Sequence, residues 1–235
     1  MEVYHRHKLK ERKKIRELIF EFFMLFLAVT LGFFMENLRE KTAEKHKEKE
    51  YIVSLIKDIE NDTANIQLSI ERNKKQVAGI DSLINLTRTA VPDSKMEKFY
   101  EYTYMYLNTY YGFTPRDLTM TQLKNAGGLR LIENKPVLDS LVGYYSKIER
   151  YNDINGRLYN KLLEDIINLE MGFIDFETYK NQHWGKYDSK SVKEFRNRAI
   201  AYNSCISWQI EWLGTVHKKS TSLLAFLKKE YNIEE

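Results

Sequence analysis

The sequence predicts an all-α protein in which an N-terminal transmembrane helix continues into a long helix and is followed by an antiparallel helical bundle. Three observations support this prediction. Only 3 of the 235 residues are proline and 10 are glycine, so few residues interrupt helices. A run of 18 mostly apolar residues near the N-terminus is long enough to cross a bilayer. Beyond it, apolar residues recur at helical spacing over long stretches.

The excess positive charge of the chain lies entirely at its N-terminus. The net charge is +4, and residues 1–17 contain 7 basic and 3 acidic side chains. The remaining 218 residues contain 30 basic and 30 acidic side chains and are therefore neutral. The isoelectric point of about 8.8 thus describes a basic tail rather than a basic binding surface, and we expect no nucleic-acid partner.

The predicted membrane span runs from Leu18 to Met35, which makes the lipid bilayer the first expected partner. Apart from Glu21 and Thr30 these residues are apolar all round a helix, and at about 1.5 Å per residue they extend roughly 27 Å. A buried core helix and a cleaved signal peptide are the alternatives. A core helix rarely has an apolar surface on every side, and no small-residue cleavage site follows the run.

The basic tail sets the expected orientation of this span. By the positive-inside rule, residues 1–17 stay in the cytoplasm and residues 36–235 lie on the periplasmic side of a bacterial inner membrane. The asymmetry is modest, because basic residues also follow the span closely: Arg39, Lys41, Lys45, Lys47 and Lys49.

The chain after the span begins with a charged helical neck and then a long apolar stripe. Residues 36–50 are nearly all charged and are expected to form a solvated helix. The stripe that follows has alternating spacings of four and three residues, which is typical of a helix packed along its length. It consists of Ile52, Ile56, Ile59, Thr63, Ile66, Ile70, Asn73, Val77, Ile80 and Ile84. Packing within the chain and packing against a second copy would bury the same face.

Residues 51–235 are expected to form a single periplasmic bundle domain. Capping-box patterns at Ser94–Glu97, Thr119–Gln122 and Ser191–Glu194 predict three helix starts. The first of these helices is expected to reach about Tyr111. Another helix is expected to start at Asn134–Pro136, where proline is tolerated in the first turn, and to run to about residue 169.

Two further apolar stripes mark the buried faces of the last two long helices. The stripe of the helix that starts near residue 134 contains Leu138, Leu141, Tyr145, Ile148, Tyr151 and Ile154. The stripe of the last helix contains Val192, Phe195, Ala199, Tyr202, Ile206, Ile210, Leu213, His217, Leu224 and Leu227.

Three segments together resemble a known family. The span Glu21–Asn37 starts with an acid and ends in Glu-Asn, a charged neck leads into Glu50–Asp62, and Leu123–Asn134 is followed by Leu138–Tyr145. This combination resembles a domain-of-unknown-function family of single-pass bacterial membrane proteins common in Bacteroidota. The resemblance covers about residues 15–170, and the span here is richer in Phe than in most of the family. It implies an inner-membrane anchor and a periplasmic helical domain, and it implies no activity or site residues.

Glu21 is the first candidate functional residue, because an acid within a membrane helix is costly unless it faces water, a headgroup or a partner. One interpretation places it at the cytoplasmic interface near Arg16 or Lys14. The other places it opposite further copies or another subunit, as in the stator of an ion-driven motor.

Aromatic residues supply the second set of candidates. Tyr100, Tyr102, Tyr104 and Tyr106 cannot all be buried on one face of a helix, so some are expected to be exposed, as at a protein interface or a glycan-stacking surface. Trp208 and Trp212 on the last helix are expected to serve similarly.

Motifs for catalysis are absent from the sequence. It contains no P-loop, no Gly-rich dinucleotide fingerprint, no His-Glu-x-x-His and no Gly-x-Ser-x-Gly. We therefore expect no enzymatic activity, no cofactor and no metal site. Cys205 is the single cysteine and is expected to behave as a small buried hydrophobe.

The leading functional hypothesis is a membrane-anchored structural or interaction protein that assembles with itself or with envelope partners through helix faces. A second hypothesis is a periplasmic ligand-sensing helical domain that signals through a partner. A third is an accessory subunit of a membrane ion pathway or stator that uses Glu21.

Overall fold

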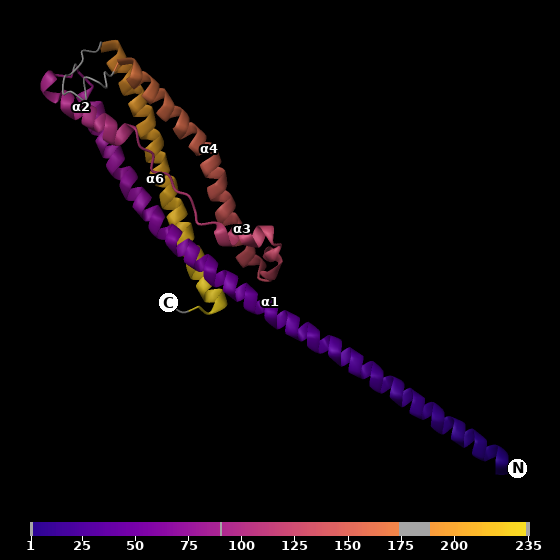
Figure 1. The fold of residues 1–235 in the computed structure, drawn as a ribbon. Coiled ribbons are helices and arrows are strands. Elements are labelled where there is room, and N and C mark those ends of the chain that lie inside the picture. The colour runs from indigo at the N-terminus through magenta and orange to yellow at the C-terminus, as the bar shows by residue number, and fades with distance from the viewer. Residues whose placement is uncertain (1, 90, 174–188, 234–235) are drawn as a thin grey trace. The chain divides into compact units, whose positions relative to one another are not determined.

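The computed structural model describes residues 2–89, 91–173 and 189–233, with side chains from residue 15 onward (Figure 1). All regular structure in these ranges is helical, which confirms the predicted all-α class. The chain divides into two compact units, with the division between Tyr51 and Ile52. Helix α1 (Glu2–Leu86) contributes to both units, which are described separately below.

In the first unit α1 is helical throughout its described residues, including both the predicted span and the charged neck. Every side chain from Ile15 to Ala43 is exposed. In the neck, charged residues one turn apart stabilise the helix: Arg39 donates two hydrogen bonds to the Glu36 carboxylate, of 2.5 and 3.0 Å.

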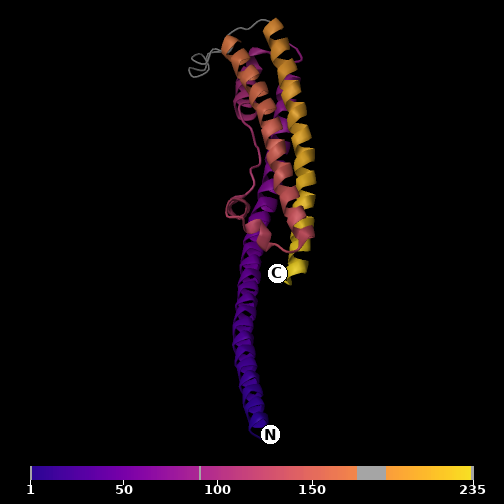
Figure 2. The same ribbon diagram turned by 90° about the vertical axis from the view of Figure 1, so that its right-hand side faces the viewer.

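The second unit is built on three long helices: α1 from Ile52 onward, α4 (Lys135–Phe173) and α6 (Ser189–Tyr231). Figures 1 and 2 show these helices side by side along most of their length. Contacts between α1 and α6 pair early residues of one with late residues of the other, so the two helices are antiparallel. The pairs are Thr63 with Ser220 and Asp81 with Asn203. Contacts between α4 and α6 follow the same order, which confirms the antiparallel bundle.

The apolar stripe of α1 is buried inside this bundle. Ile52, Ile59, Ile66 and Ile80 are completely inaccessible to solvent. The polar members of the stripe have partners in other elements, as with Thr63, whose hydroxyl lies 3.0 Å from the hydroxyl of Ser220 on α6. Intrachain packing therefore uses the face that the stripe marks.

The predicted stripes of α4 and α6 are partly wrong. On α6 the buried face continues from Leu213 through Val216, Ser220, Leu223 and Leu227, whereas the predicted His217 and Leu224 are only half-buried. The pattern failed because Ser220 is polar and was not counted as a core position, although it is fully buried against Thr63. On α4 the predicted Ile154 is exposed.

Between α1 and α4 the chain returns along the bundle in short pieces rather than as one helix. These are η1 (Asp93–Lys95), α2 (Met96–Tyr102), η2 (Thr103–Leu107), α3 (Leu118–Asn125) and η3 (Gly128–Leu131). The helix expected to reach Tyr111 ends at Leu107, and its last turn is π-helical. Residues 108–117, which link η2 to α3, are not helical, and we call them the strap.

The strap is held by side chains from all three long helices. An extended backbone cannot satisfy its own carbonyl groups, so a buried one needs donors from elsewhere. Amide and hydroxyl donors from the helices supply them, with donor–acceptor distances between 2.5 and 3.3 Å. The bonds are Gln76 to Thr109, Tyr202 to Thr109, Asn73 and Gln209 to Tyr111, Ser69 to Gly112, Asn152 to Phe113 and Tyr145 to Arg116.

We expect Gln76→Leu to lower the free energy of unfolding by about 1–3 kcal/mol. Gln76 is buried and donates to the carbonyls of Tyr106 and Thr109, and leucine would leave the Tyr106 carbonyl without this donor. Urea unfolding followed by circular dichroism measures the change. Gln67→Leu, on the exposed side of the same helix, is the control and should change stability by less than about 0.5 kcal/mol. Equal effects of the two substitutions would contradict this account of the strap.

The three predicted capping boxes do not form. The N-cap residues of α2 and α3 are Lys95 and Asp117, neither with a side-chain capping bond, and α6 begins at Ser189 rather than at Ser191. The hydroxyl of Thr119 donates instead to Asp58 on α1, at 2.5 Å. Tertiary contacts therefore override the local pattern here.

The predicted start of α4 is confirmed, since the Asn134 side chain accepts a bond from the Val137 N–H at 3.3 Å.

Candidate functional site

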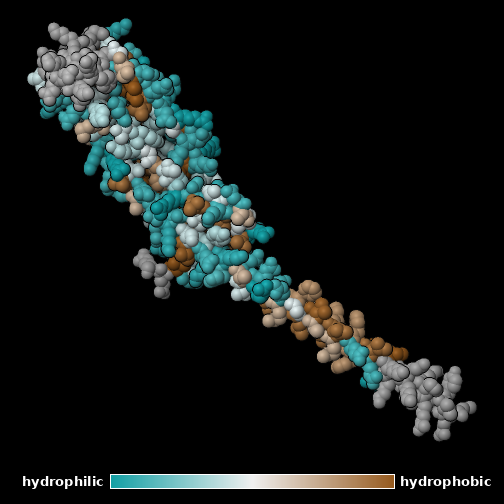
Figure 3. Space-filling model, viewed as in Figure 1, coloured by the Kyte–Doolittle hydropathy of each residue, from teal (hydrophilic) through white to brown (hydrophobic). Residues whose placement is uncertain are grey.

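The predicted membrane span is the largest exposed apolar surface of the described chain. Its 18-residue window is long and apolar enough to cross a bilayer, and none of it is buried (Figure 3). A core helix of a soluble protein would be mostly buried, so that alternative is removed for these residues. The described chain therefore has one helix, near the N-terminus, that is long and apolar enough to span a membrane.

Glu21 lies exposed on this span. Among the described side chains, Glu21 forms no ion pair with Arg16, one of its two predicted neighbours. The side chain of Lys14, the other predicted neighbour, lies outside the described residues.

The four predicted tyrosines divide between the core and the surface. Tyr100 is buried, so its proposed role as an interaction residue is wrong. Tyr102 and Tyr106 are half-buried and pack ring edge to ring face, with centroids 5.7 Å apart. The Tyr106 ring lies directly against Gly79 of α1, where any Cβ would clash with it. Only Tyr104 is strongly exposed, at 68%.

The two predicted tryptophans lie one turn apart on α6 and differ in exposure. Trp212 is half-buried and stacks on Tyr151 of α4, with ring centroids 3.5 Å apart and planes 5° from parallel. Trp208 is 69% exposed. Such a large apolar side chain is unusual at the surface of a bundle whose exposed side chains are mostly hydrophilic.

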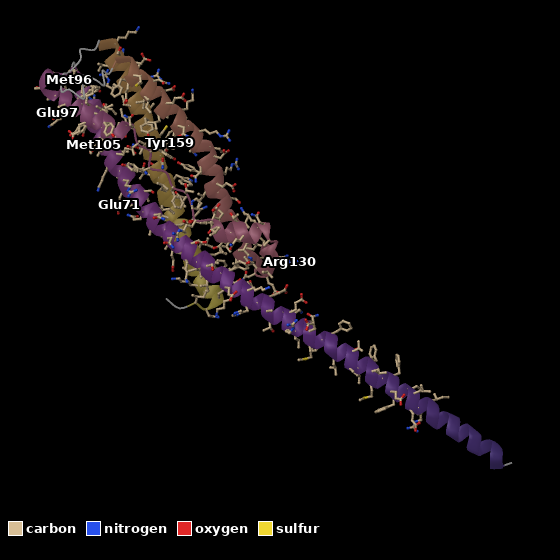
Figure 4. The ribbon with its side chains drawn as sticks, in the orientation of Figure 1. Glu71, Met96, Glu97, Met105, Arg130 and Tyr159 are labelled. Atoms are coloured by element: carbon tan, nitrogen blue, oxygen red, sulfur yellow. The ribbon has the colours of Figure 1, made fainter. Side chains whose placement is uncertain are left out.

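Three contacts fix how α4 and α6 face each other beside Trp208. Each joins a residue of α4 to one of α6, and successive contacts lie about two turns apart. They are the Tyr151–Trp212 stack, the 2.5 Å hydrogen bond from the hydroxyl of Tyr159, which is labelled in Figure 4, to the Cys205 carbonyl, and the 3.7 Å ion pair between Asp165 and Arg198. The register places Trp208 opposite the turn of α4 between Tyr151 and Tyr159.

Two more exposed apolar side chains lie on that turn of α4. Ile154 is 57% exposed and Leu158 is 44% exposed. We group them with Trp208 and the Tyr151–Trp212 stack, which lie at the same level of the α4–α6 pair, as the α4–α6 apolar face. The sequence analysis identified its two tryptophans but assigned Tyr151 and Ile154 to the core and missed Leu158, because a strip at the edge of a helix pair has the same spacing as a core stripe.

The bundle also contains two buried carboxyl groups that the sequence analysis missed. Burial raises the pKa of Asp62 to about 6, although it accepts hydrogen bonds from the Arg116 N–H at 2.8 Å and the Tyr144 hydroxyl at 3.2 Å. Burial likewise raises the pKa of Glu170 to about 7. Within the described residues, no three His, Cys, Asp or Glu side chains converge where a metal ion could be held.

Comparison with known proteins found no matching family model, no matching curated protein and no matching solved structure.

Proposed function

We propose that this protein is a membrane-anchored interaction module that binds a second copy of itself through the α4–α6 apolar face. The observation that supports the proposal is the 69% exposure of Trp208 beside Ile154 and Leu158. Tryptophan is enriched among the residues that dominate binding energy, and an apolar patch on a folded surface is typical of an interaction site.

Charged side chains beside the α4–α6 apolar face pair with one another, which favours a second copy of the chain over a charged protein as the binding partner. Asp153 pairs with Arg157 at 2.6 Å, and Asp165 pairs with Arg198 at 3.7 Å, so acids and bases compensate one another beside it. Two identical faces would then meet without net repulsion. Twofold pairing of identical surfaces is the commonest form of protein assembly, and anchoring in one membrane raises the effective concentration of the copies.

The α1 stripe, which first suggested self-assembly, does not support this proposal, because that face is buried within the chain. The exposed face of α4 and α6 takes its place. The interaction is thus proposed for a different surface from the one that the heptad pattern indicated.

Sedimentation equilibrium of the full chain in a density-matched detergent tests the proposal. We expect a dimer, and we expect Trp208→Glu to weaken dimerisation by at least about tenfold. Leu118→Glu is the matched control, since Leu118 is also 69% exposed but lies on α3, and it should leave the dimer intact.

A chain that stays monomeric at every concentration would overturn self-assembly. A dimer that survives Trp208→Glu would assign the contact to another surface, the span included. Far-UV circular dichroism of each variant distinguishes loss of pairing from loss of folding.

The same proposal includes the topology. Leu18–Met35 would cross the bacterial inner membrane once, with residues 1–17 in the cytoplasm and residues 36–235 in the periplasm, as the basic tail favours. Alkaline phosphatase fused after Glu235 should be active, since it folds only when exported; an inactive fusion would contradict this orientation.

The resemblance to single-pass Bacteroidota proteins is consistent with the proposal, which assigns no enzymatic activity and no cofactor.

A further inference from the structure

A groove between α4 and α6 has features that neither helix packing nor the proposed dimer requires. It is partly open to solvent and has a volume of about 530 Å³, within the range of about 300–1,000 Å³ typical of small-molecule sites. It lies next to the Tyr151–Trp212 stack, on the part of α4 from Asp139 to Ile148 and the part of α6 from Val216 to Phe226.

The floor of the groove is apolar. Ile148 of α4 and Val216 and Leu223 of α6 line it and are themselves almost completely buried. Phe226, one turn from Leu223, is half-buried and extends the apolar lining. Only small parts of these three buried side chains are accessible, so an alkyl chain laid in the groove would contact mainly the half-buried Phe226 and the exposed edges of the floor.

The rim of the groove is strongly basic. Three lysines line it, Lys147 on α4 and Lys218 and Lys219 on α6, against a single acid among the described lining residues, Asp139. Within the described part of the chain, none of the three ammonium groups forms an ion pair.

Lys147 and Lys219 lie beside each other across the groove. The proximity of Lys147 lowers the pKa of Lys219 below its usual range. Two like charges brought together at the mouth of an apolar groove repel each other, and an anion placed between them would relieve that repulsion.

We propose that this groove binds a single-chain anionic amphiphile, with the alkyl chain on the Ile148–Val216–Leu223 floor and the carboxylate between Lys147 and Lys219. The inference goes beyond the proposed dimer, because it concerns a different set of residues and a small ligand. It also gives the lysines a role that an apolar contact between two copies would not.

Isothermal titration calorimetry of the full chain in phosphatidylcholine nanodiscs tests this inference, with octanoate as the probe and empty nanodiscs as the blank. We expect octanoate to bind the protein and octanol, which has the same chain without the charge, to bind at least about tenfold more weakly. The double variant K147Q/K219Q should weaken octanoate binding by about tenfold or more, whereas K147R/K219R should retain it.

Lys193→Gln provides the matched control, since Lys193 is exposed on α6 away from the groove, and it should leave octanoate binding unchanged. Equal binding of octanoate and octanol, or octanoate binding that survives K147Q/K219Q, would overturn the proposal, as would the absence of binding. Because the two lysines repel each other, K147Q/K219Q should not lower the melting temperature of the protein. A lowered melting temperature would therefore reveal a folding defect rather than a loss of the binding site. The variant Trp208→Glu should still bind octanoate even though its dimer is weakened. Measuring octanoate binding in this variant therefore tests the groove independently of the proposed dimer.

Discussion

Phe195→Ala should lower the free energy of unfolding of the bundle by about 3–5 kcal/mol, the largest effect we expect from a single substitution. Phe195 is completely buried on α6 and meets Phe99 of α2 edge to face, with ring centroids 5.5 Å apart and planes 61° from parallel. Alanine would remove both the apolar transfer energy and this aromatic contact, and would leave a cavity between α6 and the returning segment. Urea unfolding of the full chain in detergent, followed by far-UV circular dichroism, measures the loss.

Ile200→Ala is the matched control for this prediction, because it truncates a large apolar side chain on the same helix outside the α4–α6 apolar face. Ile200 is exposed, so its truncation should change the free energy of unfolding by less than about 0.5 kcal/mol. A loss below about 1 kcal/mol for Phe195→Ala, or a similar loss for both substitutions, would contradict the assignment of Phe195 to the core.

Asp62→Asn should make the protein more stable than the wild type at pH 7 but not at pH 4. Burial raises the pKa of Asp62 from its ordinary value of 3.8 to about 6, so between these values the folded protein holds a proton that the unfolded chain has released. Folding is then favoured by acid, and the wild type loses stability as the pH rises from about 4 to about 6. Asparagine is uncharged at every pH. Its Oδ1 can accept the bond from the Arg116 N–H, and its amide NH2 can donate to the Tyr144 hydroxyl oxygen in place of the bond that Asp62 accepts.

We expect the stability difference between the variant and the wild type to grow by about 1–2 kcal/mol between pH 4 and pH 7. Urea unfolding of both proteins at the two pH values measures it. Glu170, whose pKa is also raised, is present in both proteins and cancels from the comparison. Glu71→Gln, an exposed change on the same helix, should show no such pH dependence, and a constant difference for Asp62→Asn would refute the prediction.

The elements predicted best from the sequence were those in which one physical signal dominates. The buried face of α1 between Ile52 and Ile84 was predicted correctly in outline, because a helix buried along one face imposes a regular spacing. Two members of the predicted stripe, Thr63 and Val77, are only half-buried. The exposure of the apolar run around Phe22 likewise followed from a surface that is apolar on every side.

The returning segment was predicted less well, because its structure depends on contacts distant in sequence. The pattern around Tyr102–Tyr106 favours a helix, and nothing local ends that helix at Leu107. What stabilises the strap is the set of donors on α1, α4 and α6, such as Gln209, whose partner Tyr111 lies 98 residues away. Capping boxes failed for the same reason, since Thr119 bonds to Asp58 rather than to its own helix.

Among the candidate interaction residues, the sequence identified residue types better than positions. Trp208 and Tyr104, two of the aromatic candidates, are strongly exposed, but Tyr100 is in the core and Ile154 is on the surface. Exposure at the edge of a helix pair depends on how α4 and α6 are rotated against each other, which the spacing of apolar residues along either helix does not specify.

The strap has a consequence for the order in which the bundle folds. Its carbonyl groups accept bonds from α1, from Tyr145 and Asn152 on α4 and from Tyr202 and Gln209 on α6, residues that lie 29 to 98 positions away along the chain. Helices form from local contacts in about a microsecond, whereas contacts across such separations must first overcome loop-closure entropy. The strap can gain its full set of donors only when all three helices are assembled, so we expect it to become ordered late in folding.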